Sequence, residues 1–504
     1  MPRRLLRALL LPLLAATLAF APGSGFSYAP PAADRVERFQ ALPPAQQLLV
    51  EDLEKRSFQW FWDSANPANG LVPDRYPGRS FSSIAAVGFA LTGYGIGVER
   101  HYITRQQAVQ RTLATLRFLR DAPQNASEDE ASGYRGFYYH FLDMRNGRRF
   151  DRAVELSSVD TALLLGGVLF AESYYDRDTP QETQIRQLAD AIYRRVDWTW
   201  MQPRAPLISM GWTPGGKFIA ADWKGYCEGM LVYILALGSP THAVTPDAWA
   251  AWSATNPLTW GRFHGETFLG FAPLFGHQYS QAWIDFRGIR DAWSRAHGLD
   301  FFQNSRLATL SQRNYAIANP GHFTGYGANV WGLTASDGPG DFRVQGPDGR
   351  EREFFGYSAR GAGLDYIRDD GTLAPTAAAG SIAFAPAVVV PALAEMKRRY
   401  GRWIYDRYGF VDAFNPSFHV DAGKLDAGKR VPELGWADTQ QLGIDQGPIL
   451  LMIENWRSDF VWKVMRSNPY VRTGLERAGF RGGWLAARAT RSPATVTATH
   501  AATP

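Results

Sequence analysis

Cysteine is almost absent from this chain of 504 residues. The single residue of this type, Cys227, cannot form a disulfide within the chain, so the fold must be stable without one. Cys227 also lies far from the N-terminal region, where a lipid anchor would have to be attached. In the context Tyr226-Cys227-Glu228-Gly229 we interpret it as a small packed residue rather than as a nucleophile.

Blocks of like charge are lacking as well. The formal net charge is +5, and three of the 53 basic residues (Arg3, Arg4 and Arg7) lie in a predicted leader, which leaves 50 basic residues against 48 acidic ones. No run of Lys and Arg could follow a phosphate backbone, which excludes nucleic acid as a partner.

The usual motifs of metal and nucleophilic chemistry are missing too. There is no His-Glu-x-x-His, no cysteine pair and no closely spaced group of histidines, so we expect neither a metal ion nor another cofactor. A Gly-x-Ser-x-Gly elbow is also absent, which argues against a serine hydrolase.

Long apolar runs are confined to the N-terminal region. Arg3 and Arg4 precede the apolar residues 5–20, Arg7 lies near the start of that run, and Ala-Phe-Ala at 19–21 offers a small-x-small cleavage site. No later stretch approaches the length of about 18 to 20 apolar residues that a membrane span requires. We therefore expect residues 1–33 to be a signal peptide and Pro/Ala-rich lead-in. The protein is then exported to the periplasm or the extracellular space, without integral membrane association.

Apolar residues at helical spacing recur through residues 34–485, which we expect to form one catalytic domain, followed by a disordered Ala/Thr/Pro-rich tail at 486–504. Strand signals are sparse, as at 136–142 and 342–345. Apolar, Gly-containing helices alternate with charged amphipathic ones, which favours a double ring of helices with long loops forming a cleft at one end. About twelve helices are predicted: 46–62, 82–98, 104–119, 158–174, 179–196, 221–237, 245–253, 280–296, 299–316, 386–400, 445–465 and 470–478.

Aromatic residues are abundant, at 13% of the chain with 17 Trp. Many of them stand beside Gly, Asn, His or Asp rather than in apolar runs. A core rich in aromatic residues is one explanation. The other is a cleft for sugars, because the flat C–H faces of sugar rings stack on aromatic rings without requiring a charge.

Cleavage of a glycosidic bond requires two carboxyl groups, one protonated and one ionised. One candidate segment is Val-Glu-Leu-Ser-Ser-Val-Asp-Thr at 154–161, where Glu155 and Asp160 stand at the start of an apolar helix. Backbone N–H groups at a helix start favour anions. The alternative is a pair of ordinary capping carboxylates, but Asp160 precedes an unbroken apolar stretch, and a buried acid is costly unless it is employed.

The second candidate is Glu228, which stands among Tyr226, Cys227 and Met230. Such surroundings raise the pKa of a carboxyl group, as a general acid requires. Trp212, Trp223 and Tyr226 lie in or near this segment and are candidates for binding substrate.

Other segments combine aromatic residues with neutral or acidic polar groups, which is the mixture that recognition of a polyol requires. Each could separately be a tight turn. The substrate-binding candidates from these segments are Tyr138, His140, Asp143, His277, Gln278, Tyr326, Asn329, Trp331 and Asp445.

Several of these segments together resemble the glucoamylase-like (glycoamylase-like) domain family, in consistent order over roughly residues 51–472. The resemblance implies an all-α fold, an (α/α)6 toroid. It also implies an activity like that of glycoside hydrolase family 144, which cleaves β-1,2-glucan with inversion, and it places the acidic positions on Glu155 and Glu228, supported by Asp160. The segments are Gly-Leu-Val-Pro-Asp-Arg at 70–75, residues 83–88, 155–164, 223–229, Gly-His-Gln-Tyr at 276–279, residues 325–332 and Asp-Gln-Gly-Pro at 445–448.

From the sequence we thus expect a secreted, monomeric glycoside hydrolase that acts on an oligo- or polysaccharide. Which of Glu155 and Glu228 is the acid stays open at this point. A transglycosylase or a polysaccharide lyase on the same toroid, or a glucan-binding protein without activity, are the alternatives.

Overall fold

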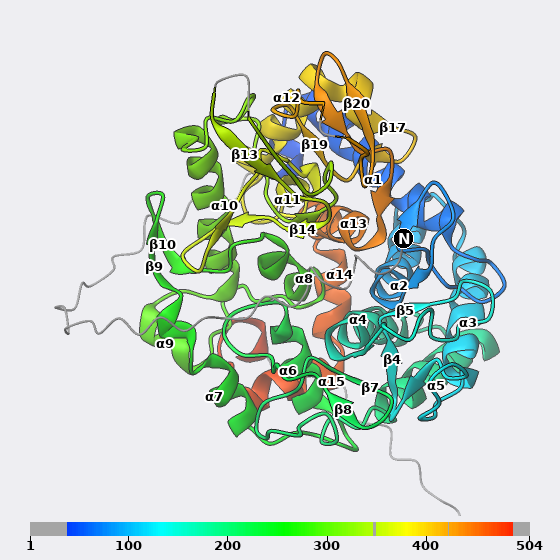
Figure 1. Ribbon diagram of the computed structural model, residues 1–504. Coiled ribbons are helices and arrows are strands. Elements are labelled where there is room, and N and C mark those ends of the chain that lie inside the picture. The colour runs from blue at the N-terminus through cyan, green and yellow to red at the C-terminus, as the bar shows by residue number, and fades with distance from the viewer. Residues whose placement is uncertain (1–37, 346–348, 422, 487–504) are drawn as a thin grey trace, which may run out of the picture.

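The computed structural model describes residues 38–345, 349–421 and 423–486, and these residues are largely helical (Figure 1). The prediction of a mainly helical fold is confirmed to that extent. The predicted signal peptide and lead-in at 1–33 lie outside the described residues, as does the predicted tail at 486–504 except for its first residue. Within the described ranges, no helix is both long and apolar enough to cross a bilayer.

The helices account for most of the regular secondary structure of the described chain, and most of the predicted ones are present. They are α1 (Pro44–Ser64), α2 (Ile84–Glu99), α3 (Arg105–Asp121), α4 (Ser158–Tyr174), α5 (Pro180–Arg194), α6 (Gly229–Gly238), α7 (Asp247–Ser253), α8 (Phe275–Trp283), α9 (Ala292–His297), α10 (Phe301–Ala318), α11 (Pro375–Ala379), α12 (Pro386–Ile404), α13 (Gly443–Ser458), α14 (Phe460–Arg466) and α15 (Pro469–Arg477).

Three predicted helices differ from the structure. The helix expected at 221–237 begins only at Gly229, because the preceding residues form a loop. The helix expected at 280–296 is interrupted after Trp283, where the chain becomes extended, and α9 begins separately. The helix expected at 445–465 is broken at Asp459, whose φ of 64° is left-handed and ends the helical path.

The loops carry many more strands than the sequence predicted, although none has more than four residues. They pair antiparallel, and the largest sheet has the order β3-β4-β6-β7-β8. The strands are β1 (Arg75–Tyr76), β2 (Ser82–Ser83), β3 (Gly133–Tyr134), β4 (Phe137–Tyr139), β5 (Phe141–Leu142), β6 (Leu156–Ser157), β7 (Gly211–Thr213), β8 (Lys217–Phe218), β9 (Trp260–Phe263), β10 (Glu266–Leu269), β11 (Ala335–Ser336), β12 (Phe342–Gln345), β13 (Glu351–Phe354), β14 (Ser358–Ala359), β15 (Gly361–Ala362), β16 (Ile367–Arg368), β17 (Tyr405–Asp406), β18 (Gly409–Phe410), β19 (Phe414–Asn415), β20 (Lys429–Val431), β21 (Gly435–Ala437) and β22 (Gln441–Leu442).

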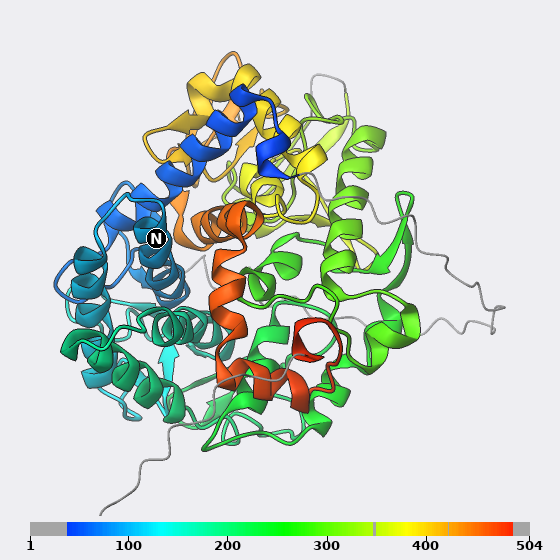
Figure 2. The same cartoon turned by 180° about the vertical axis from the view of Figure 1, so that it is seen from behind.

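Six helices are buried over most of their length, and their labels surround the centre of Figure 1: α2, α4, α6, α8, α11 and α13. Helix α2 packs on α4 and α13, α4 on α6, α6 on α8, and α11 on α13. The Gln278 side chain links α8 to α11, because its Nε2 donates to Ala377 O at 2.8 Å. Helix α14 contacts α2, α4 and α8, and it crosses behind these helices in Figure 1 and in front of them in Figure 2.

Glycine allows α2 and α4 to approach within backbone contact. A Cβ atom on Gly88 would lie 2.2 Å from Leu163 O, and one on Gly167 would lie 2.0 Å from Gly88 O. No side chain fits at either position. The apolar, Gly-containing pattern of these two helices therefore reflects close packing in the interior.

A buried ion pair fixes the loops that follow β13. Arg360 and Asp370 are fully buried, with Nε to Oδ1 at 2.8 Å and Nη2 to Oδ2 at 2.9 Å. The guanidinium also donates to the carbonyl oxygens of Ser336 and Phe355, so its donors are well used. Such a pair is costly to break from one side.

We expect Asp370→Ala to lower the free energy of unfolding by about 3–5 kcal/mol, because it leaves the Arg360 charge buried without its partner. Urea denaturation followed by circular dichroism measures this. The matched control is Glu353→Ala, which breaks an exposed pair with Arg343 and should cost about 0–1 kcal/mol. Equal effects of the two substitutions would contradict the assignment.

Candidate active site

The N-terminal ends of four buried helices meet at one acidic cluster. Tyr279, in the second turn of α8, lies at the meeting point. Burial raises the pKa of Tyr279 well above its ordinary value. The charges of nearby groups, including Asp445, Glu228 and Asp160, raise it further. These three carboxyl groups stand at the starts of α13, α6 and α4, respectively. The positive ends of the helix dipoles therefore face the same group of acids.

His140 bridges two of the predicted carboxyl groups. Its Nδ1 lies 2.9 Å from Oε1 of Glu155, and its Nε2 lies 3.4 Å from Oδ1 of Asp160. Burial alone would lower the pKa of His140, but Asp160 and Glu155 raise it to about 9. His140 is therefore a cation at neutral pH, and both of its N–H groups are directed to acids. That His140 also binds substrate stays a prediction.

The same contacts separate the two acids electrostatically. Burial raises the pKa of Glu155, but the charge and the hydrogen bond of His140 outweigh burial and hold it below the ordinary value. At Asp160 burial prevails over His140 and over the Ser157 hydroxyl, which donates at 2.5 Å, and the pKa is raised. Ser157, and not Glu155, caps α4. The capping interpretation of Glu155 is therefore wrong, and its carboxylate contacts His140 instead.

Glu228 keeps its proton to a higher pH than Glu155 does. Burial, with a smaller contribution from Asp160, raises its pKa to about 7. The residue is partly exposed, whereas its Oε2 is enclosed and has no hydrogen-bond partner among the described residues. Although Glu228 precedes the first residue of α6, its side chain makes no capping hydrogen bond. It is thus a carboxyl group that holds a proton near neutral pH with no evident structural use.

Aromatic residues from the second candidate segment position Glu228. Trp223 Nε1 donates to Ser158 Oγ at 2.8 Å, which ties this loop to the start of α4. Its ring also packs against Gly229, where an added Cβ would come within 3.0 Å of the indole. Trp212 lies on β7, the strand that pairs with β6. Its ring stacks on that of Tyr134, with the ring centres 5.2 Å apart. Two of the predicted aromatic candidates therefore flank the two candidate acids.

His277 is neutral and fully engaged. Its Nε2 donates to Phe271 O and its Nδ1 accepts from the Tyr226 hydroxyl, each at 3.2 Å. Burial lowers the pKa of His277 to about 3. The two predicted residues Tyr226 and His277 thus position the loop before α6, and the third, Gln278, joins α8 to α11.

A second acidic group lies beside the first. One carboxylate oxygen from each of Asp337, Asp412 and Asp438 lies within 4.8 Å of the other two, a spacing that could hold a hard cation. Arg75 offsets part of the charge, with its Nη1 2.5 Å from Asp337 Oδ2. Burial, followed by repulsion from neighbouring carboxylates, raises the pKa of Asp412 and of Asp438 well above the ordinary value. Protonation therefore relieves the remaining repulsion in this group.

Asp445, a predicted binding residue, lies against this second group. Burial is the largest influence on its pKa, which is raised to about 7, and Asp337 and Asp74 contribute to the rise. Its carboxyl group shares a hydrogen bond with that of Asp412, which requires a proton on one of the two acids. The sequence did not single out the partners Asp74, Arg75 and Asp337 as site residues, although the first two belong to the recognised segment 70–75.

Other predicted binding residues have structural contacts instead. The Tyr138 hydroxyl donates to Leu119 O at 2.7 Å, in the packing against α3. Asp143 accepts from the backbone of Arg145 and Asn146 and so forms a turn. Trp331 is fully buried, and Asn329 is exposed on a loop. Among the described residues, none of the four has a hydrogen bond or an ion pair with Glu155 or Glu228, and their binding of substrate stays a prediction.

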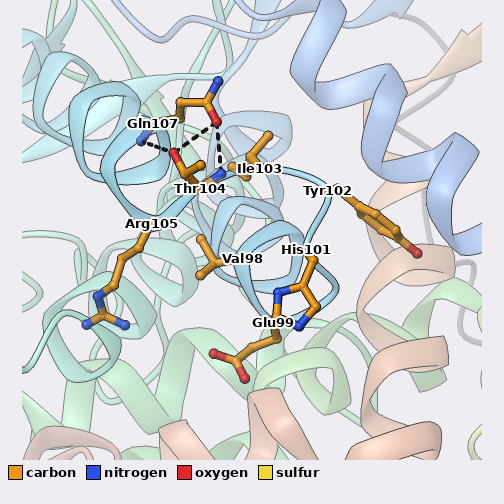
Figure 3. A pocket seen from close by; sticks show the side chains of 8 residues that line it. All are labelled: Val98, Glu99, His101, Tyr102, Ile103, Thr104, Arg105 and Gln107. Carbon is orange, nitrogen blue, oxygen red and sulfur yellow. Dashed lines mark hydrogen bonds between the residues drawn. The ribbon is translucent and has the colours of Figure 1, made fainter.

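A separate hollow of about 430 Å³ lies at the opposite end of α2 (Figure 3). Its hydrogen bonds join Thr104 and Gln107, which form the capping box of α3. Glu99 and Arg105 are its charged members. It brings together no pair of acids and lies far along α2 from the acidic cluster, so it is not a rival site.

Comparison with known proteins gives consistent relatives. Residues 220–469 match the sequence model of the Glycoamylase family, described as putative glucoamylase. A crystal structure from Bacteroides uniformis, described in the same words, has 31% identity and a TM-score of 0.74, covering 87% of this chain and 98% of that one. An endo-β-1,2-glucanase from Chitinophaga pinensis, solved with sophorotriose and glucose, has 27% identity and a TM-score of 0.74, covering 87% and 99%.

A curated relative from Parabacteroides distasonis is named exo β-1,2-glucooligosaccharide sophorohydrolase (non-reducing end). It is 28% identical over an alignment of 468 positions that covers 86% of this chain. The matched region spans only 58% of the length of that relative.

Proposed function

Since this chain belongs to the glycoamylase-like family, we propose that it is a glycoside hydrolase that cleaves β-1,2-linked glucan with inversion at the anomeric carbon. The observation that carries the proposal is Glu228, a carboxyl group with a pKa of about 7 at the start of a buried helix. It interacts with Asp160, which His140 links to the ionised Glu155. The names of the relatives from Chitinophaga pinensis and Parabacteroides distasonis support the β-1,2 linkage.

We further propose that the six buried helices form the inner ring of an (α/α)6 toroid. The packing order α2-α4-α6-α8, the Gln278 link to α11, and the contacts of α13 with α11 and α2 support a closed ring. In such a ring the starts of the inner helices lie at one end. The acidic cluster at the starts of α4, α6, α8 and α13 fits this arrangement.

In the proposed mechanism Glu228 is the general acid. Its proton passes to the glycosidic oxygen while the bond from the anomeric carbon to that oxygen breaks. Enclosure of the carboxyl group keeps it protonated near neutral pH, when an exposed glutamic acid has lost its proton. The leaving glucan departs with a hydroxyl group, and Glu228 is left ionised until it takes up a proton from solvent.

Glu155 is the proposed base. A water molecule attacks the anomeric carbon from the face opposite the leaving oxygen, and Glu155 takes its proton. His140 holds this carboxylate ionised and orients it through the 2.9 Å contact. Asp160, on the other side of His140, completes the charge arrangement and contributes to the raised pKa of Glu228.

The activity is tested by incubating the purified protein with linear β-1,2-glucan, laminarin and starch and identifying the products by mass spectrometry. We expect short sophoro-oligosaccharides from the β-1,2-glucan only. An unsaturated product would indicate a lyase, and products longer than the substrate would indicate a transglycosylase. Binding of glucan without any cleavage would indicate a binding protein, and each of these results would contradict the proposal.

The pH dependence of kcat/KM should report the two carboxyl groups. Activity requires protonated Glu228, so it should fall as pH rises through about 7. Activity also requires ionised Glu155, whose pKa lies below its ordinary value of 4.5, so the acidic limb should lie below that pH. Initial rates at low substrate concentration between pH 3 and pH 9 measure both limbs, and activity that rises above pH 7 would contradict the assignment.

A further inference from the structure

A cavity of about 860 Å³ opens beside the acidic cluster, between the loop after α10 and strands β13 and β16. Figure 1 shows α10 and β13 next to α8 and α11. We call this cavity the outer pocket, and its members include Phe271, Phe323, Phe355 and Tyr366. Its volume lies within the range of about 300–1,000 Å³ typical of ligand sites.

The lining combines flat apolar faces with polar groups. The guanidinium of Arg352 lies over the Phe323 ring at 5.2 Å, and that of Arg368 lies over the Phe355 ring at 3.9 Å. Three cations and four anions line the pocket, so neither sign of charge dominates: Arg350, Arg352, Arg368, Glu351, Glu353, Asp365 and Asp369. Such a surface suits a neutral polyol better than a charged ligand.

Asp369 is fixed in place by two phenols. The hydroxyls of Tyr326 and Tyr315 donate to it at 2.7 and 3.0 Å. Burial raises the pKa of Asp369 to about 6. The sequence predicted that Tyr326 binds substrate. Its hydroxyl is bonded to Asp369, so Tyr326 holds that carboxylate in place at the wall of the outer pocket.

The outer pocket is connected to Glu228 in two ways. The pKa of Tyr366 is raised by burial, by Asp365 and then by Glu228, so the phenol lies within electrostatic reach of the proposed acid. Phe271, on another wall, accepts the hydrogen bond of His277, which is bonded in turn to Tyr226 before Glu228. Two walls of the pocket are therefore close to the segment that carries Glu228.

We propose that the outer pocket binds further glucose units of the same glucan chain whose bond is cleaved beside Glu228. This inference rests on the proposed function and extends it, because it makes the enzyme favour long chains over short oligosaccharides. The pocket contributes to binding at a distance from the reacting bond and takes no part in the chemistry.

Ile367 offers a way to block the pocket without disturbing the core, because it lines the pocket and is 55% exposed. The test compares Ile367→Trp with the parent protein on a ladder of sophoro-oligosaccharides and on long β-1,2-glucan. Ile317→Trp is the matched control, since Ile317 is 49% exposed and does not line the pocket. A second variant, Phe323→Leu, removes one flat face while keeping an apolar side chain.

We expect Ile367→Trp and Phe323→Leu to lower kcat/KM on long glucan by about tenfold, with little change on the shortest cleaved oligosaccharide. Ile317→Trp should behave as the parent at every length. Equal effects on short and long substrates, or no effect in both pocket variants, would overturn the inference while cleavage itself stays intact. If the parent cleaves no β-1,2-glucan and its Glu228→Gln variant binds none in calorimetry, both the proposed function and this inference fail.

Discussion

Glu228→Gln is expected to lower kcat on β-1,2-glucan by about 10²–10⁴-fold, the contribution that general acid catalysis typically makes. Glutamine keeps the shape of the side chain but cannot give a proton to the glycosidic oxygen. The fold should be retained, because Oε2 has no hydrogen-bond partner in the described structure that the substitution would remove. Steady-state kinetics with the purified variant measure the loss.

The control for this variant is Glu172→Gln. The pKa of Glu172 is also raised to about 7 by burial, but this residue lies in the last turn of α4 and is bonded to Asn468, away from Asp160. It should keep the parental kcat. An aryl β-sophoroside with a good leaving group needs no proton, so Glu228→Gln should cleave it at close to the parental rate. A defect of equal size on that substrate would show that Glu228 is not the acid.

Glu155→Gln is the second substitution with a large expected effect, again about 10²–10⁴-fold in kcat. The reason differs, because the variant can no longer take the proton of the attacking water. The aryl sophoroside should not restore its activity, since water still has to be activated. Azide, which needs no base, should restore cleavage and give an α-glycosyl azide, the inverted product.

Glu182→Gln is the matched control for this variant. The pKa of Glu182 is also held low, by Arg105, although burial opposes the shift, and the residue belongs to the first turn of α5, away from the acidic cluster. Its loss should leave kcat unchanged even if stability falls. A Glu155→Gln enzyme that retains parental kcat would show that Glu155 is not the base, and Asp445 would be the next candidate for that role.

The sequence predicted the parts of the site that depend on local context. The apolar and aromatic neighbours of Glu228 predicted a raised pKa, and the structure has one. The helix starts after Ser157 and Thr104 were visible because the capping residues act within one turn. The early start predicted for α6 was wrong because its apolar pattern extends into a loop that Trp223 anchors to Ser158.

Contacts between distant segments were not predictable in the same way. His140 meets Glu155 and Asp160 because β4 pairs with β6, and the spacing along the chain does not reveal that pairing. Arg75 meets Asp337 across 262 positions. Tyr138 and His140 are two positions apart and would share one face of a continuous strand, but β4 ends at Tyr139, and the sequence alone does not show where the strand ends.

The most direct test of inverting hydrolysis at this site is proton NMR of the first products from linear β-1,2-glucan. The mechanism predicts that the α-anomer of the new reducing end appears first and converts slowly to the equilibrium mixture. Immediate appearance of the β-anomer would indicate a retaining mechanism and would contradict the roles given to Glu155 and Glu228.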